Sequence, residues 1–292
     1  MKEKFRDRQF NEQSLAIIEK VNQVIDEYAA QGFDLSVRQI FYQFVARNWL
    51  RNTIKNYEAL AKVISEARIA GLVDWSYIRD RGRVTIKDQA YPSLKVFLQQ
   101  TNEQFKLDCW ANQANYIECM VEKQALEGVL LKVCNDWNIA FTANKGYSSS
   151  STMYERAKFM QSKRDVEGKA VHVAYFSDLD PSGCDMVRDI KERLEMFSDG
   201  PVTMHNLALT YDQAVNFQLP ENPVKLKDSR SDDFVAKYGE SSWELDALNP
   251  TQLAHLLTSK IQELTNLTRW EIDQKRQVAC QDELQTYIDE LT

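Results

Sequence analysis

The feature that most constrains the fold is a regular alternation of apolar runs and amphipathic helical stretches between residues 115 and 209. Four apolar runs have the length of buried strands, at 115–121, 139–143, 170–177 and 202–209. Three stretches with helical spacing separate them, at 123–137, 151–163 and 182–197. Strands that alternate with helices pair in parallel, so we expect an α/β domain with a mostly parallel sheet. A loop-rich segment over 218–250 and C-terminal helices over 250–292 follow it.

The first hundred residues have a different pattern. Apolar positions at helical spacing predict three helices, over 11–30, 37–48 and 54–70. Ser36 is the expected N-cap of the second helix. Residues 73–87 are typical of two short strands around a turn, which gives the order of a winged helix-turn-helix, although a generic small helical domain fits nearly as well. We therefore expect a DNA-binding domain over 1–105 and the α/β domain over 106–292.

Composition excludes several classes of protein. Hydrophobic residues make up 43% of the 292, enough for a core, and no apolar run reaches the roughly 18 residues of a membrane span. The charged start lacks the apolar segment of a secretory signal, so we expect a cytoplasmic, nucleoid-associated protein without a membrane partner. Five scattered cysteines argue against a disulfide framework and a structural zinc site. The nine glycines form neither a G-x-G-x-x-G fingerprint nor a Walker A loop, so we expect no ATP site.

The net charge of −7 argues against a nucleic-acid partner only until the chain is divided. Residues 1–100 hold 16 Lys and Arg against 12 Asp and Glu, whereas the remainder holds 20 against 31. Basic residues are most concentrated between 38 and 87, as on a surface that binds a phosphate backbone. The DNA-binding candidates here are Arg47, Arg51, Lys55, Arg79, Arg81 and Arg83. The last three alternate and would share one face of a strand; a merely solvated basic face is the alternative.

Acidic residues follow two of the expected strands at their C-terminal ends. Asp178 and Asp180 come directly after the third strand, and Glu122 follows the first, next to Lys123. The C-terminal ends of parallel strands form the edge where ligands bind in open α/β sheets. Carboxylates crowded there repel one another, and a hard cation such as Mg²⁺ relieves the repulsion. The three acids therefore predict a magnesium site for phosphodiester chemistry.

Three short motifs follow the first three strands: Glu122-Lys123, Lys145-Gly146-Tyr147 and Asp178-Leu-Asp-Pro-Ser-Gly183. They resemble the motifs of the Toprim domain, which occurs in topoisomerases, bacterial primases and certain nucleases. The second and third are similar to those of the topoisomerase VI A subunit and its relative, the meiotic double-strand-break protein. In that family a winged helix with an Arg-x-x-x-Tyr motif precedes the Toprim domain. Arg38 and Tyr42 have this spacing, and the likeness is strongest to stand-alone "mini-A" proteins of bacteria and mobile elements.

The resemblance, which covers roughly residues 30–210, implies cleavage of double-stranded DNA by transesterification. Tyr42 would be the nucleophile and Arg38 its partner. Mg²⁺, or Mn²⁺ in its place, would be held by Glu122, Asp178 and Asp180. Lys123 and Lys145 are further DNA-binding candidates. The resemblance also implies a homodimer in which the tyrosine of one protomer meets the metal site of the other, and it is compatible with a separate ATPase subunit and with relaxation of DNA.

Two other functions stay open. The protein could be a Toprim nuclease that uses metal-activated water, with Tyr42 structural, since a tyrosine among other aromatic residues is usually part of a core. It could also be a non-catalytic DNA-binding or assembly protein. The chain departs from topoisomerase VI after Tyr147, where four serines replace the usual Pro-Asp. The segment Trp243-Glu-Leu-Asp-Ala-Leu248 is similar to a late motif of the family, and we assign it no role.

Overall fold

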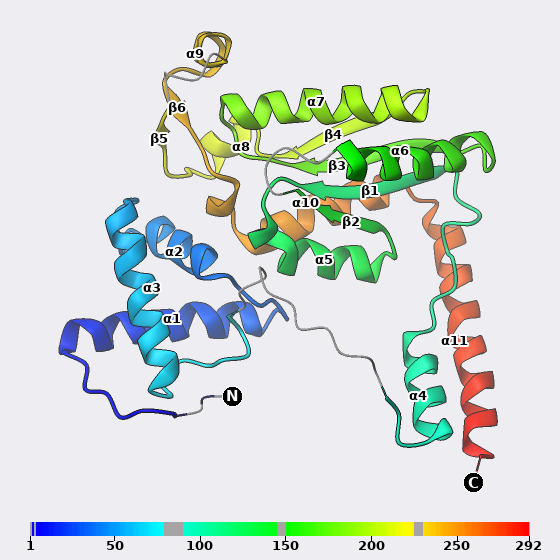
Figure 1. The fold of residues 1–292 in the computed structure, drawn as a ribbon, viewed down its shortest axis with the longest axis horizontal. Helices are drawn as coiled ribbons and strands as arrows, with labels where there is room; N and C mark the ends of the chain where they lie inside the picture. Colours follow the sequence, from blue (N-terminus) through cyan, green and yellow to red (C-terminus); the bar gives the residue numbers. More distant parts are fainter. Residues whose placement is uncertain (1, 3, 79–89, 145–149, 225–229, 292) are drawn as a thin grey trace.

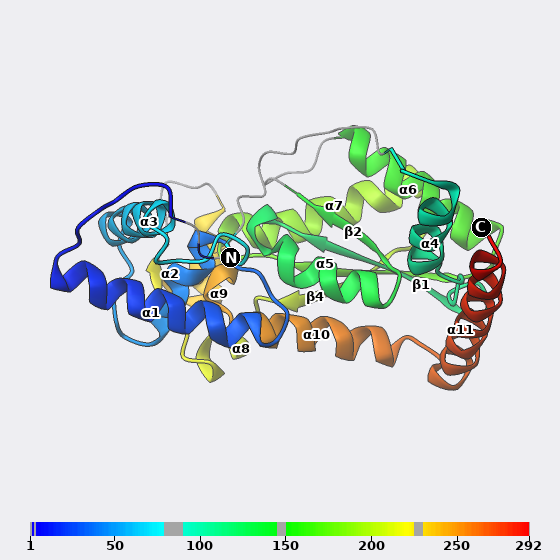
Figure 2. The same ribbon diagram turned by 90° about the horizontal axis from the view of Figure 1, so that it is seen from below.

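In the computed structural model of this protein, the described residues are 2, 4–78, 90–144, 150–224 and 230–291. A unit of three helices lies on one side of a layered α/β unit, and a pair of helices, one short and one long, lies at the opposite end (Figures 1 and 2). In the part of the chain that is described, no helix combines the length and apolar character needed to cross a membrane.

The first unit contains the three expected helices: α1 (Glu12–Ala29), α2 (Val37–Ala46) and α3 (Ile54–Ile69). Ser36 caps α2 as predicted: its hydroxyl oxygen accepts the Gln39 backbone N–H, and the Gln39 side-chain oxygen accepts the Ser36 backbone N–H, which completes a capping box. Of the expected β-ribbon, the described part shows only an isolated bridge between Leu35 and Ile78. The remainder of that ribbon, with Arg79, Arg81 and Arg83, lies outside the described residues, so the winged helix stays a prediction.

The second unit is built on the predicted parallel sheet. Its strands are β1 (Asn115–Val121), β2 (Ala140–Ala143), β3 (Ala170–Phe176) and β4 (Thr203–Ala208). They pair in the order β2-β1-β3-β4, and every pairing is parallel. Val121 is the register partner of Phe176, so β1 and β3 end side by side. The prediction of an α/β domain with a parallel sheet is confirmed.

Helices cover both faces of the sheet (Figure 1). The connecting elements are η1 (Gln124–Leu126), α5 (Glu127–Asp136), α6 (Ser150–Asp165), α7 (Pro181–Ser198) and α8 (Tyr211–Asn216). Strand β1 shows why two layers form, since successive side chains of a strand point to opposite faces. Ile117 and Val121 pack in the core that includes α5, whereas Tyr116 and Met120 pack in the core that includes α6 and α7.

The segment expected to be loop-rich carries short elements. These are β5 (Asn222–Pro223), α9 (Ser231–Tyr238), β6 (Ser241–Ser242) and η2 (Leu245–Ala247). Strands β5 and β6 pair antiparallel as a small hairpin. The two predicted C-terminal helices are present as α10 (Pro250–Glu263) and α11 (Leu267–Asp289).

Helix α4 (Leu94–Gln104) packs against α11 rather than against α1–α3 (Figure 1). The Asn102 and Gln281 side chains each donate to the other residue's backbone carbonyl at 3.0 Å, and Lys95 Nζ donates to the Leu291 carbonyl at 2.8 Å. The expected boundary at residue 105 grouped α4 with the first three helices. The structure instead places it with the C-terminal helix, at the far end of the molecule from α1–α3.

The two units share a continuous core. One cluster of buried side chains runs from Ile40 and Phe44 of α2 through Leu245 of η2 to Leu253 and Leu257 of α10. All five cysteines are free, in agreement with the expectation that disulfides do not hold this chain together.

Two histidines supply a pH-dependent contact between β3 and β4. His172 Nδ1 lies 3.1 Å from His205 Nε2, and the rings stack. Burial lowers the pKa of both imidazoles below the ordinary value, and the ammonium of Lys260 adds to the effect. In the unfolded chain both imidazoles therefore protonate at a higher pH than in the folded protein.

The free energy of unfolding should accordingly fall as the pH drops from about 7 through the ordinary histidine pKa of about 6.5. Chemical denaturation at several pH values measures this. The double variant His172→Asn/His205→Asn should have a shallower pH dependence, whereas His255→Asn, at an exposed position on α10, should keep the wild-type slope. Equal slopes in all three proteins would contradict the expectation.

Candidate active site

The ends of β1 and β3 bring two of the predicted acids together. The Glu122 backbone N–H donates to the Phe176 carbonyl at 2.9 Å, which extends the parallel pairing by one residue. The Asp178 backbone N–H then donates to Oε2 of Glu122 at 3.1 Å. Asp178 is buried, and its Oδ1 accepts the Leu245 backbone N–H at 2.7 Å. Both carboxylates are therefore fixed at the C-terminal edge of the sheet.

Asp180 starts helix α7. Its Oδ1 accepts the Gly183 backbone N–H at 2.6 Å, as the N-cap of that helix, and Pro181 occupies the first turn. A Cβ atom on Gly183 would lie 2.2 Å from the Asp178 carbonyl oxygen, so only glycine fits this turn. The Asp-x-Asp-Pro-x-Gly motif is thus a compact strand-to-helix turn that holds both aspartates near one edge.

Two further acids reach this edge from the late segment to which the sequence assigned no role. Leu179 and Trp243 exchange backbone hydrogen bonds of 2.9 and 3.0 Å, which place residues 243–246 beside the aspartate turn. Glu244 and Asp246 follow from this bridge. Asp246 is buried, and neither of its carboxylate oxygens has a hydrogen-bond partner among the described residues. The signals in the sequence were the Glu-x-Asp spacing and the similarity of residues 243–248 to a late motif of the topoisomerase VI A family.

Lys123 lies at the centre of these acids. Its ammonium is 2.7 Å from Asp178 Oδ2 and 3.3 Å from Asp246 Oδ2, and it forms a short contact with Glu244. Burial by itself lowers the pKa of Lys123, but the three carboxylates outweigh it and raise the pKa. The lysine is therefore a charged ammonium inside the site, next to Glu122 as the sequence indicated, and its role in DNA binding stays a prediction.

Helix α2 approaches the same acids with Arg38 and Tyr42. The guanidinium of Arg38 reaches Glu244 Oε2 at 3.1 Å through Nη2 and Asp246 Oδ2 at 3.4 Å through Nε. Tyr42 follows one helical turn later on the same face and is 3% exposed. Arg38, Tyr42, Asp180 and Glu244 all line one cavity of about 590 Å³. The structure thus brings the predicted nucleophile, its arginine and an acid of the sheet edge to a single cavity.

The electrostatics of the site disfavour further negative charge. Burial, together with the Glu244 carboxylate, raises the pKa of Tyr42 to about 12, although the positive charges of Arg38 and Lys123 oppose the rise. Burial also raises the pKa of Glu122, and it raises the pKa of Asp178 to about 7 against the effect of Lys123. For Glu244 the effect of burial is outweighed by Lys123 and Arg38, which lower its pKa. Glu244 is thus held as a carboxylate, in contrast to Glu122 and Asp178.

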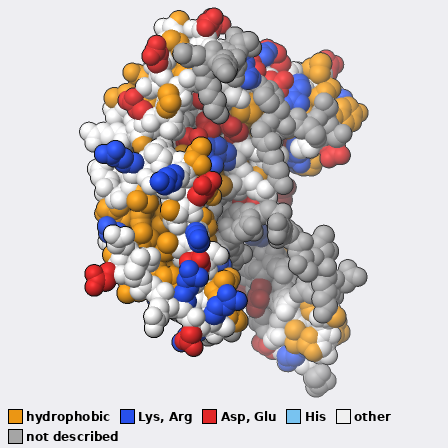
Figure 3. All heavy atoms as spheres, turned by 60° about the vertical axis from the view of Figure 1, so that its left-hand side comes forward, with side chains coloured by type: hydrophobic (Ala, Val, Ile, Leu, Met, Phe, Trp, Pro, Cys, Tyr) orange, Lys and Arg blue, Asp and Glu red, His pale blue; other side chains and the backbone are white. Residues whose placement is uncertain are grey.

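The remaining DNA-binding candidates have different surroundings. Arg51 and Lys55 are exposed and flank residues 52–54, which line the cavity. Arg47 is paired with Glu27 at 2.6 Å, and its guanidinium lies over the Trp49 ring. Lys145 lies outside the described residues. On the face that carries the first unit, Lys and Arg side chains are interspersed with acidic ones (Figure 3).

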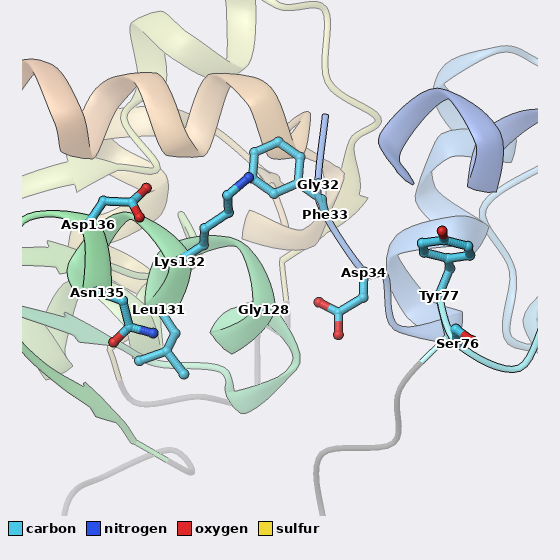
Figure 4. Close-up of a pocket in the computed structure, with 10 residues that line it drawn as sticks. All are labelled: Gly32, Phe33, Asp34, Ser76, Tyr77, Gly128, Leu131, Lys132, Asn135 and Asp136. Carbon is cyan, nitrogen blue, oxygen red and sulfur yellow. The ribbon is translucent and has the colours of Figure 1, made fainter. Parts of the chain in front are cut away.

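A second cavity, of about 550 Å³, separates the first unit from α5 (Figure 4). Lys132 reaches from α5 toward the Phe33 ring, and its Nζ donates to the Gln31 carbonyl at 3.0 Å. It is lined by none of the predicted catalytic or metal-binding residues, whereas the cavity beside Tyr42 is lined by Arg38, Tyr42 and Asp180.

Comparison with known proteins gives no family for this chain: no family model matches it, and no curated protein does. Within the described ranges, no three His, Cys, Asp or Glu side chains form a ready group of metal ligands. The functional assignment therefore depends on the geometry of the site and on the motif resemblance.

Lys123→Ala should destabilise the protein by about 3 kcal/mol, because it leaves the buried carboxylate of Asp178 without its cation and that of Asp246 with Arg38 alone. Denaturant unfolding measures the change. Lys191→Ala is the matched control: Lys191 is exposed and lies 3.9 Å from Glu195, and loss of such a surface pair costs about 1 kcal/mol or less. Equal losses in the two variants would show that Lys123 does not hold the acids together.

Proposed function

We propose that this protein cleaves double-stranded DNA by a Mg²⁺-dependent transesterification with Tyr42 as the nucleophile. The observation that supports it most directly is the single cavity lined by Tyr42, Arg38, Asp180 and Glu244. The motif resemblance to the topoisomerase VI A family supports it independently. In the proposed reaction the Tyr42 oxygen forms a bond to phosphorus while the bond from phosphorus to one sugar oxygen breaks. The phenol proton is transferred overall to the departing oxygen, and DNA is left joined to the protein.

Each residue has a role that its surroundings support. Arg38 lies beside Tyr42, so its guanidinium can hold the phosphate under attack and stabilise the developing phenolate. Because the phenol pKa is about 12, Tyr42 is protonated at neutral pH. Additional positive charge near the phenol would lower this pKa and favour the phenolate. Arg51 and Lys55, exposed beside the cavity-lining residues, would bind the neighbouring phosphates of the strand.

The donor set at the sheet edge fits a hard divalent cation. Among the described residues, five carboxylates lie there, from Glu122, Asp178, Asp180, Glu244 and Asp246, against two cations, Lys123 and Arg38. Carboxylate oxygens are ligands that Mg²⁺ prefers. Burial raises the pKa of Glu122 and of Asp178, and the positive charge of a bound cation would favour the ionised forms of both. Glu122, Asp178 and Asp180 would hold it. When bound, Mg²⁺ would neutralise phosphate charge and stabilise the departing oxygen.

A second candidate is a Toprim-type nuclease in which water attacks the phosphate and Tyr42 is structural. The near-complete burial of Tyr42 favours it, as does the edge-to-face contact between the Tyr42 and Phe41 rings at 5.6 Å. The two reactions differ in their product, because only the first leaves a covalent bond between protein and DNA.

Tyr42→Phe should abolish protein-linked DNA breaks while leaving the fold intact, since only the hydroxyl is removed. Supercoiled plasmid is incubated with protein and Mg²⁺, and denaturing electrophoresis with and without protease detects the adduct. Tyr57→Phe is the matched control, because Tyr57 packs on the same Phe41 ring but has no arginine one turn before it. DNA cleavage retained by Tyr42→Phe would favour the nuclease.

Asp180→Asn separates the role of Asp180 as the N-cap of α7 from its proposed role as a Mg²⁺ ligand. Asparagine caps a helix about as well as aspartate, so the stability of the metal-free protein should change by less than about 1 kcal/mol. The rise in melting temperature on addition of Mg²⁺ should be lost, because the charge is gone. Asp212→Asn, on exposed α8, is the control that keeps the Mg²⁺ shift. A normal shift in Asp180→Asn would exclude this aspartate as a ligand.

A further inference from the structure

On the basis of the proposed function, we infer that a single chain supplies both the tyrosine and the acidic edge of each cleavage site. The resemblance implied the opposite arrangement, with Tyr42 acting on the metal site of a partner protomer. In this structure Tyr42 and Arg38 line the same cavity as Asp180 and Glu244 of their own chain. No second copy is needed to bring these groups together.

Ion pairs join the two halves of the site within the chain. Arg38 of α2 contacts Glu244 at 3.1 Å and Asp246 at 3.4 Å, and both acids also contact Lys123 at the end of β1. Asp246 is fully buried, so moving α2 away would leave its carboxylate with one cation instead of two. Removing a partner from a buried ion pair is costly, which favours the arrangement within one chain.

Contacts away from the ion pairs hold the same arrangement. Asn52 Nδ2, in the loop before α3, donates to Asn222 Oδ1 of the β5–β6 hairpin at 2.8 Å across the cavity wall. At the other end of the interface Gln31 accepts hydrogen bonds from Lys132 of α5 at 3.0 Å and Thr251 of α10 at 2.6 Å. The shared apolar core lies between them. These contacts join the first unit to the α/β unit of the same chain on both flanks of α2 in the sequence, so Tyr42 is held near its own acids.

Complexes of two differently tagged copies test this inference. Both copies are co-expressed, and complexes with both tags are isolated by two affinity steps. They are incubated with supercoiled plasmid and Mg²⁺, and the chain that carries DNA is identified by its size on a denaturing gel. In the first pair, wild type is combined with a Tyr42→Phe/Asp180→Ala double variant. In the second, Tyr42→Phe is combined with Asp180→Ala.

The two arrangements give opposite patterns. A site within one chain puts DNA on the wild-type chain of the first pair and on neither chain of the second. A site shared between chains gives no adduct in the first pair and puts DNA on the Asp180→Ala chain of the second, which would overturn the inference. If no doubly tagged complex forms while wild type produces adduct, the site is complete in one chain. If a wild-type pair forms no adduct, the proposed function itself fails.

A crosslink provides a readout that does not depend on cleavage. Arg38→Cys and Glu244→Cys are introduced together, with the exposed Cys184 and Cys280 replaced by serine, and a short bismaleimide is added. We expect a crosslink within one chain, which leaves the protein at monomer mass on a denaturing gel and joins the two peptides in mass spectra. A crosslinked dimer as the main product would overturn the inference even if cleavage were confirmed.

Discussion

Carboxylates buried at one edge of a sheet repel one another, and the ammonium of Lys123 offsets much of that repulsion here. It lies 2.7 Å from Asp178 and also contacts Glu244 and Asp246. These acids come from the end of β3 and from the late segment, and Arg38 connects both late acids to α2. One partly buried cation therefore fixes the strand ends, the late segment and, through Arg38, helix α2 relative to one another.

Most of the fold was predictable, because apolar residues recur at the spacings typical of strands and helices. Alternate positions of β1 face different cores, and the parallel order of the strands follows from the helices between them. The C-terminal ends of all strands in a parallel sheet lie at the same edge. This alone predicts that Glu122 and Asp178 lie close together, without any knowledge of side-chain positions. Likewise Arg38 and Tyr42 share a face because a helix brings residues four apart together.

Contacts between segments far apart in the sequence produce no periodic pattern of apolar residues. Glu244 and Asp246 reach the site through a single backbone bridge between Leu179 and Trp243, and one bridge creates no repeating pattern of apolar residues. The pairing of α4 with α11 similarly depends on amide hydrogen bonds such as those between Asn102 and Gln281. The sequence shows that polar residues are present in these segments, but it does not show which distant segment each one meets.

Glu244 has two effects on the tyrosine that follow from the same charge. It binds Arg38 and so keeps the guanidinium beside Tyr42, and it raises the pKa of the phenol together with burial. A guanidinium has five N–H donors, so Arg38 can keep a carboxylate partner while it binds a phosphate. In the absence of a bound cation the phenol therefore stays protonated. Added positive charge at the acidic edge would weaken the effect of Glu244. Under the proposed function, a bound cation would therefore favour ionisation of Tyr42.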